Sequence, residues 1–128
     1  MTKILIAVFM GGGIGSLLRY AAQTLVHSNS SPLLFPWATF GVNVAGSFLI
    51  GLFYALSARF HLSDDVRLFL TTGLCGGFTT FSTLSHESVT MIRQGCYGTF
   101  LIYAAASIAL GVAAAFAGAW AGTAFSGK

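Results

Sequence analysis

Apolar residues dominate four long segments of the chain, and most charged residues lie at the ends of these segments or between them. Three stretches contain no Lys, Arg, Asp or Glu: 20–58, 68–86 and 94–127. A helix needs about 20 residues to cross the hydrocarbon core of a bilayer. The segments also lack the strict alternation of apolar and polar residues that strands of a membrane barrel show. The pattern therefore predicts an all-α membrane protein with four transmembrane helices, at about 4–26, 37–58, 67–92 and 97–125.

The expected connections are short and contain turn-forming residues. The first lies at 28–32 with Pro36. In the second, Ser63 precedes two aspartates and is a suitable N-cap for the third helix. In the third, Gly95 is suited to ending a helix. An even number of spans puts both termini on one side, which the basic residues weakly identify as cytoplasmic. No linker or repeat divides the chain, so we expect a single domain over 1–128.

Composition supports the membrane assignment and excludes several functions. Hydrophobic residues make up 55% of the chain and charged residues 7%, against about 25% charged in an ordinary soluble domain. We therefore expect membrane lipid around the protein and no nucleic acid as partner. The two cysteines and three histidines lack the spacing of metal ligands. We expect neither a catalytic metal nor an enzyme.

Small residues four positions apart occur on the first and fourth segments. Gly11 with Gly15, and Gly118 with Gly122, allow two helix backbones to approach closely. Packing inside one subunit and packing between subunits both explain them. Because four helices enclose little space for a permeation path, we expect a homodimer.

The third segment has an unusual central run at 71–83, which is rich in glycine and hydroxyl side chains. Gly73, Gly76 and Gly77 weaken a helix, and hydroxyls compete for its backbone hydrogen bonds. The run predicts a helix broken in mid-membrane, although a continuous packing helix also accommodates these residues. A break frees carbonyls that hold cations and amides that attract anions.

Uncharged hydrogen-bond donors occur within two other segments. On the second segment, Thr39 and Asn43 share one face, and Asn43 either lines a path or joins two helices. On the fourth, Tyr103 and Ser107 are one turn apart. Arg19 either extends to the membrane surface or places its charge in an aqueous vestibule. The only acid in a span, Glu87, lies near a span end.

Donors without a central acid suit an anion, because cation pathways usually need an embedded carboxylate. The edge of a Phe ring carries partial positive charge. Phe81, Ser82 and Thr83 on a broken helix are therefore candidates to coordinate a small dehydrated anion.

Three blocks in order closely resemble the bacterial Fluc (CrcB) family of fluoride channels. The most specific is Thr-Thr-Gly-Leu-Cys-Gly-Gly-Phe-Thr-Thr-Phe-Ser-Thr at 71–83. The others are Gly-Gly-Gly-Ile-Gly-Ser-Leu-Leu-Arg-Tyr at 11–20 and Thr-Phe-Gly-Val-Asn-Val-Ala-Gly at 39–46. The four-span layout extends the resemblance over the whole chain.

The resemblance implies an antiparallel, dual-topology homodimer with two fluoride pathways. It implies a structural Na⁺ at the dimer axis, held by backbone carbonyls of Gly76 and Thr79 from each subunit, and Arg19 near a vestibule. Leu84 stands where the family commonly has a second pore Phe. The pore positions implied or indicated by the residues are Thr39, Asn43, Phe81, Ser82, Thr83, Leu84, Tyr103 and Ser107.

Passive export of fluoride across a bacterial inner membrane is the function expected from this resemblance. A small multidrug antiporter is also built from four helices, but it needs an acid in the first span, and 4–26 contains none. A non-transporting membrane assembly subunit is the remaining alternative, which fits the small-residue faces but does not require a broken helix.

Overall fold

The computed structural model describes residues 1–27 and 35–125, and these are almost entirely helical. The first predicted connection, at 28–32, lies outside the described residues. The helical elements, in chain order, are α1 (Thr2–His27), α2 (Trp37–Phe60), α3 (Asp64–Leu68), η1 (Phe69–Cys75), α4 (Gly76–Phe78), α5 (Phe81–Arg93) and α6 (Tyr97–Phe125).

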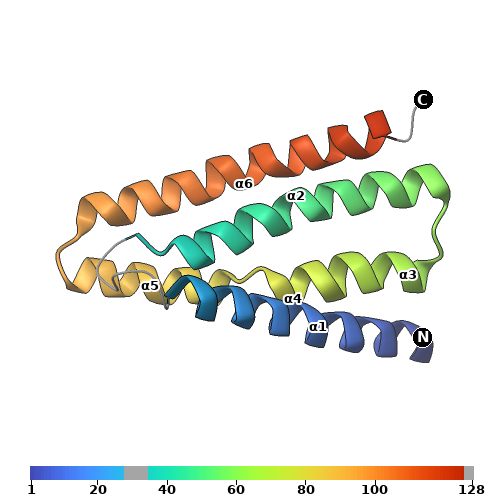
Figure 1. Cartoon of the computed structure of the whole chain (residues 1–128), viewed down its shortest axis with the longest axis horizontal. Helices are drawn as coiled ribbons and strands as arrows, with labels where there is room; N and C mark the ends of the chain where they lie inside the picture. The colour runs from blue at the N-terminus through green and yellow to red at the C-terminus, as the bar shows by residue number, and fades with distance from the viewer. Residues whose placement is uncertain (28–34, 126–128) are drawn as a thin grey trace.

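The four helical segments run alternately in opposite directions (Figure 1). Three are the single helices α1, α2 and α6, each long and apolar enough to cross a membrane. The fourth is the series from α3 to α5, which bends near its middle. The start of α1 and the end of α6 lie at the same end of the bundle (Figure 1). The four segments predicted from the hydrophobic pattern are therefore helical in the structure, with ends shifted by up to a few residues.

Two close helix pairs form the bundle. The most extensive contact joins α2 with α6, and the next joins α1 with η1 and α4. At Gly118 an added Cβ would overlap the Phe48 carbonyl oxygen, and at Gly15 it would overlap that of Leu74. Glycine is thus required where these backbones meet, because helices in lipid associate through close packing of small residues. Packing within one subunit accounts for these glycines.

The second and third predicted connections have the expected backbone conformations, with one difference in hydrogen bonding. Gly95 has a φ of 78°, the left-handed conformation suited to ending α5. His61 ends α2 in the same region, with a φ of 53°. Ser63 occupies the N-cap position of α3 with extended backbone, but its side chain makes no capping hydrogen bond.

The third segment is broken, but not at its glycines. Gly73 lies in the π-helical stretch η1 and Gly77 in α4, where α1 approaches both: an added Cβ on Gly73 would lie 3.0 Å from the Val8 oxygen. The chain leaves helical geometry at Thr79 and Thr80, whose ψ angles are 161° and 119°. Gly73 and Gly77 therefore serve close packing, while two β-branched residues that favour extended backbone form the break.

Candidate functional site

Thr79 and Thr80 form hydrogen bonds with backbone groups at the two helix ends that meet at the break. The Thr79 amide and hydroxyl both donate to the Cys75 carbonyl at 3.0 Å, which closes the first half of the helix. The Thr80 hydroxyl accepts from the Thr83 amide at 3.2 Å and so caps α5. The same hydroxyl donates to the Thr83 hydroxyl at 3.1 Å.

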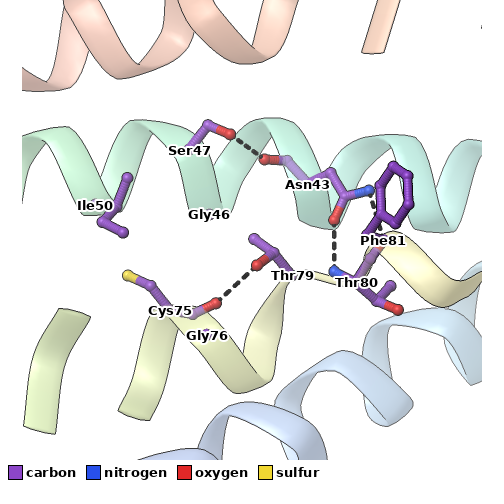
Figure 2. A pocket seen from close by; sticks show the side chains of 9 residues that line it. All are labelled: Asn43, Gly46, Ser47, Ile50, Cys75, Gly76, Thr79, Thr80 and Phe81. Atoms are coloured by element: carbon purple, nitrogen blue, oxygen red, sulfur yellow. Dashed lines mark hydrogen bonds between the residues drawn. The ribbon is translucent and has the colours of Figure 1, made fainter. Parts of the chain in front are cut away.

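Asn43 on α2 binds the backbone of the break from the side (Figure 2). Its Nδ2 donates to the Thr80 carbonyl at 3.1 Å, and its Oδ1 accepts from the Thr80 amide at 2.8 Å. The side-chain amide thus replaces the partners that Thr80 would have in a continuous helix. Asn43 thus joins two helices, α2 and the broken one, as one of its two alternatives expects.

Arg19 contacts the other side of the break. Its Nε donates to the Gly77 carbonyl at 3.0 Å, and the side chain is half-buried. In a continuous helix that carbonyl would accept from Phe81, so Arg19 satisfies a group freed by the break. Its positive charge also lies at the carbonyl end of the first half-helix, where cations are favoured. The two alternatives considered for Arg19, the membrane surface and a vestibule, did not include this contact.

The break leaves groups of opposite polarity close together. The Thr80 amide, the usual donor to the Gly76 carbonyl, donates to Asn43 instead. The Thr83 amide, the usual donor to the Thr79 carbonyl, donates to the Thr80 hydroxyl. At α5 the first amides have no acceptor within the helix. The carbonyl side suits a cation, and the amide side suits an anion.

A cavity of about 310 Å³ opens beside the break. Phe81 is 79% exposed at its edge, and Ser82 beside it is exposed. Leu84, one turn further along α5, is half-buried. The cavity lining consists of Asn43, Gly46, Ser47, Ile50, Cys75, Gly76, Thr79, Thr80 and Phe81 (Figure 2).

A second polar cluster surrounds Glu87. Tyr103 Oη donates to Glu87 Oε1 at 2.7 Å, and Thr39 Oγ1 donates to Oε2 at 3.0 Å. Gln23 Nε2 donates to Thr39 Oγ1 at 3.4 Å. Thr39 and Tyr103 are fully buried. The Ser107 hydroxyl, one turn from Tyr103, is buried and has no hydrogen-bond partner among the described residues.

The cluster at the break and the cluster at Glu87 are neighbours along α2, because Asn43 of the first and Thr39 of the second are one helical turn apart. The structure brings together the predicted residues Asn43, Phe81, Ser82, Thr83, Gly76 and Thr79 at the break. Thr39 and Tyr103 lie together at Glu87, with their hydroxyls engaged by its carboxylate. Sequence reasoning identified Glu87 as the only acid in a span but missed this role. Gln23 was missed as well; a polar side chain in the first apolar segment was the available signal.

The sequence matches known proteins over nearly its full length. A family model described as "CrcB-like protein, Camphor Resistance (CrcB)" matches residues 6–119. A curated protein of Bacteroides fragilis named "Fluoride-specific ion channel FluC" is 52% identical over 125 residues, covering 96% of this chain and 98% of the relative. Proteins of the same name from Thermus thermophilus and Leptospira interrogans are 50% identical over 111 residues and 45% over 120 residues. They cover 87% and 93% of this chain, and 88% and 94% of the relatives, respectively. The chain belongs to the CrcB-like family.

Proposed function

We propose that this multi-pass membrane protein is a fluoride-specific channel that lets fluoride leave the cytoplasm passively. Relatives that carry this name match nearly the whole chain. The observation that carries the proposal is the position of Phe81, whose ring is 79% exposed beside the broken helix. A ring edge, the Ser82 hydroxyl and the first amides of α5 are all donors or positive dipole ends. Together they suit a small anion that has lost its water.

The physics of the break favours a second subunit. Within the bilayer core, irregular backbone is tolerated only where protein or a water-filled cavity satisfies it. Yet Gly76 and Ser82 are exposed on the outside of this bundle, where lipid would otherwise meet them. We propose that a second copy covers this face. An antiparallel, dual-topology homodimer would create two equivalent pathways from one sequence.

The pathway that we propose extends from the break toward the Glu87 cluster. Its first part is lined by Asn43 on α2 and by four residues of α5, namely Phe81, Ser82, Thr83 and Leu84. Tyr103, Ser107 and Thr39 line its second part. There the Ser107 hydroxyl is available to turn toward an anion, whereas Thr39 and Tyr103 would have to exchange Glu87 for it. Leu84 offers no ring edge, so Phe81 carries more of the anion's coordination.

We also propose a structural Na⁺ at the dimer axis. The chain's own groups fit it: the carbonyls of Gly76 and Thr79 have lost their usual helical donors, and both residues line the open cavity. Carbonyl oxygens are ligands that hard cations prefer. When bound, the ion would neutralise carbonyl dipoles from both subunits at the contact. Arg19, which donates to the Gly77 carbonyl, places a positive charge at the same carbonyl end of the half-helix.

In a bacterial inner membrane the direction of flow follows from the potential. A membrane potential of 100 mV is worth about 2.3 kcal/mol for each elementary charge. An inside-negative potential therefore drives fluoride outward without a coupled ion or nucleotide.

The test is fluoride efflux from liposomes that contain the purified protein, with chloride as the control ion and Na⁺ varied. We expect fast, fluoride-selective efflux that needs Na⁺. Phe81→Ala should reduce it at least about tenfold, the effect of losing roughly 1.4 kcal/mol of stabilisation. The matched control is Phe116→Ala on α6, where a 73% exposed ring lies away from the cavity. Equal efflux in both variants removes Phe81 from the pathway, and no efflux from the wild type overturns the channel.

A further inference from the structure

A second hollow lies away from the break at Thr79 and Thr80, at the corner where α2 ends and α3 begins. It has a volume of about 470 Å³. Figure 1 shows this corner at the end of the bundle that also contains the start of α1. Tyr54, Ser57 and Ala58 line it from α2, and Arg67 and Leu68 line it from α3. The lining therefore combines one cation, two hydroxyls and an apolar side.

Ser57 is the unusual residue of this hollow. It is 6% exposed, and its hydroxyl has no hydrogen-bond partner among the described residues. Hydroxyls on membrane helices commonly donate to the carbonyl four residues earlier. Other helical hydroxyls of this chain do so, namely Thr24, Ser47, Thr71, Ser88, Thr90 and Thr123. A buried donor without an acceptor costs free energy, so Ser57 indicates a ligand that completes the site.

Arg67 supplies the charge. Its Nη1 donates to Asp64 Oδ1 at 3.0 Å, and its side chain is 34% exposed whereas that of Asp64 is 70% exposed. A guanidinium has five N–H donors in a planar fork, so this single contact leaves most of them for another acceptor. Arginine forks match the oxygens of a phosphate group.

The position of the hollow near the end of α2 indicates the source of such a phosphate. Tyr54 and Ser57 lie in the last two turns of α2, a helix long enough to span the bilayer. Tyr54 is half exposed, as expected for a tyrosine at the membrane interface. Basic pockets between membrane helices bind lipid headgroups at this level. Leu68 and Ala58 offer an apolar side for the adjoining acyl chain.

We infer that this corner is a binding site for the phosphodiester of an anionic phospholipid. The Arg67 fork holds the phosphate oxygens, and the hydroxyls of Ser57 and Tyr54 donate to them. The site is separate from the pathway proposed above and does not depend on it.

Native mass spectrometry of the purified protein tests the inference. The protein is mixed in detergent with phosphatidylglycerol, with phosphatidylcholine or with inorganic phosphate, and bound adducts are measured. We expect phosphatidylglycerol to be retained, and Arg67→Gln to lower its retention about tenfold, since charge-assisted hydrogen bonds are the strong ones. Ser57→Ala should lower it about threefold, and Arg67→Lys should fall between wild type and Arg67→Gln.

The matched control is Arg93→Gln, because Arg93 is an exposed arginine in the last turn of α5. Retention that is unchanged in Arg67→Gln, or lowered equally in Arg93→Gln, overturns the site. Binding of inorganic phosphate without lipid overturns the lipid as its source. A weaker association of subunits in Ser57→Ala and Arg67→Gln, with lipid retention unchanged, assigns the corner to the partner subunit and also overturns it. Circular dichroism of each variant verifies that it is folded.

Discussion

The side-chain amide of Asn43 and the backbone of Thr80 form two reciprocal hydrogen bonds, of 3.1 Å and 2.8 Å. An asparagine side chain has the same donor and acceptor as a peptide group. It therefore provides the hydrogen-bond partners that the Thr80 backbone lacks where the helix is interrupted. This pairing fixes α2 to the start of α5. It also leaves one Nδ2 hydrogen of Asn43, a residue that lines the cavity, outside the pair.

Asn43→Leu should lower fluoride efflux at least about tenfold and the free energy of unfolding by about 1–3 kcal/mol, because the Thr80 amide and carbonyl lose their partners. Thermal unfolding and liposome efflux measure the two effects. Asn43→Asp keeps the acceptor for the Thr80 amide but lacks the donor to its carbonyl. We therefore expect its free energy of unfolding to lie between those of the wild type and Asn43→Leu. Wild-type stability in Asn43→Leu would show that the pairing does not hold the break.

The number and position of the helices could be predicted from the sequence because hydrophobic length is a local property. The exact place of the break within 71–83 could not, because glycine at 73, 76 and 77 weakens a helix whether it bends or packs against another. Only the approach of α1 shows that Gly73 and Gly77 serve packing. Likewise, Thr39, Glu87 and Tyr103 come from three helices. Their meeting depends on how those helices are rotated and offset, which no single segment encodes.

Arg19→Ala should lower the free energy of unfolding by about 1–3 kcal/mol, because the Gly77 carbonyl loses a charged donor. Arg19→Lys should recover only part of this, since lysine lacks the Nε–H of the guanidinium fork. Denaturation midpoints of the two variants measure the effect. Arg93→Ala, at an exposed arginine, is the control and should stay within about 0.5 kcal/mol of wild type. Equal effects at the two arginines would contradict capping of the break by Arg19.

Tyr103→Phe should lower the free energy of unfolding by roughly 0.6–1.7 kcal/mol, from the average to the largest value measured for hydrogen bonds between helices of a membrane protein. The lost bond is the 2.7 Å contact to Glu87. A double-mutant cycle with Glu87→Gln should give a coupling of at least about 0.5 kcal/mol, because the two groups touch. Tyr54→Phe removes a hydroxyl from a half-exposed tyrosine that does not contact Glu87, and it should show no coupling to Glu87→Gln. Additive effects of Tyr103→Phe and Glu87→Gln would contradict a direct contact.

Gly15→Ala should destabilise the subunit by about 1–3 kcal/mol through overpacking. An added Cβ would overlap the Leu74 carbonyl oxygen and lie 2.8 Å from the Phe78 amide nitrogen. These are backbone atoms, which cannot move aside as a flexible side chain can. Gly13→Ala is the matched control, two residues away on α1, where an added Cβ meets nothing within 4 Å. It should be neutral or raise stability by up to about 1 kcal/mol, because alanine favours a helix. Thermal unfolding of the two variants measures the difference.

Gly76→Ala separates the fold of one subunit from the contact proposed between two. Within the subunit an added Cβ has no neighbour nearer than the Thr71 oxygen at 3.9 Å, so helicity by circular dichroism should be unchanged. In the proposed dimer the same Cβ would crowd the carbonyls assigned to Na⁺ and the partner's backbone. Overpacking of about 1–3 kcal/mol corresponds to about a tenfold or greater loss in subunit association. Chemical crosslinking in liposomes measures the loss, and fluoride efflux should then need more Na⁺.

Gly98→Ala, at an exposed glycine of α6 with no neighbour within 4 Å, should leave both subunit association and the Na⁺ requirement unchanged. Full association and an unaltered Na⁺ requirement in Gly76→Ala would exclude this face as the site where two subunits and the ion meet.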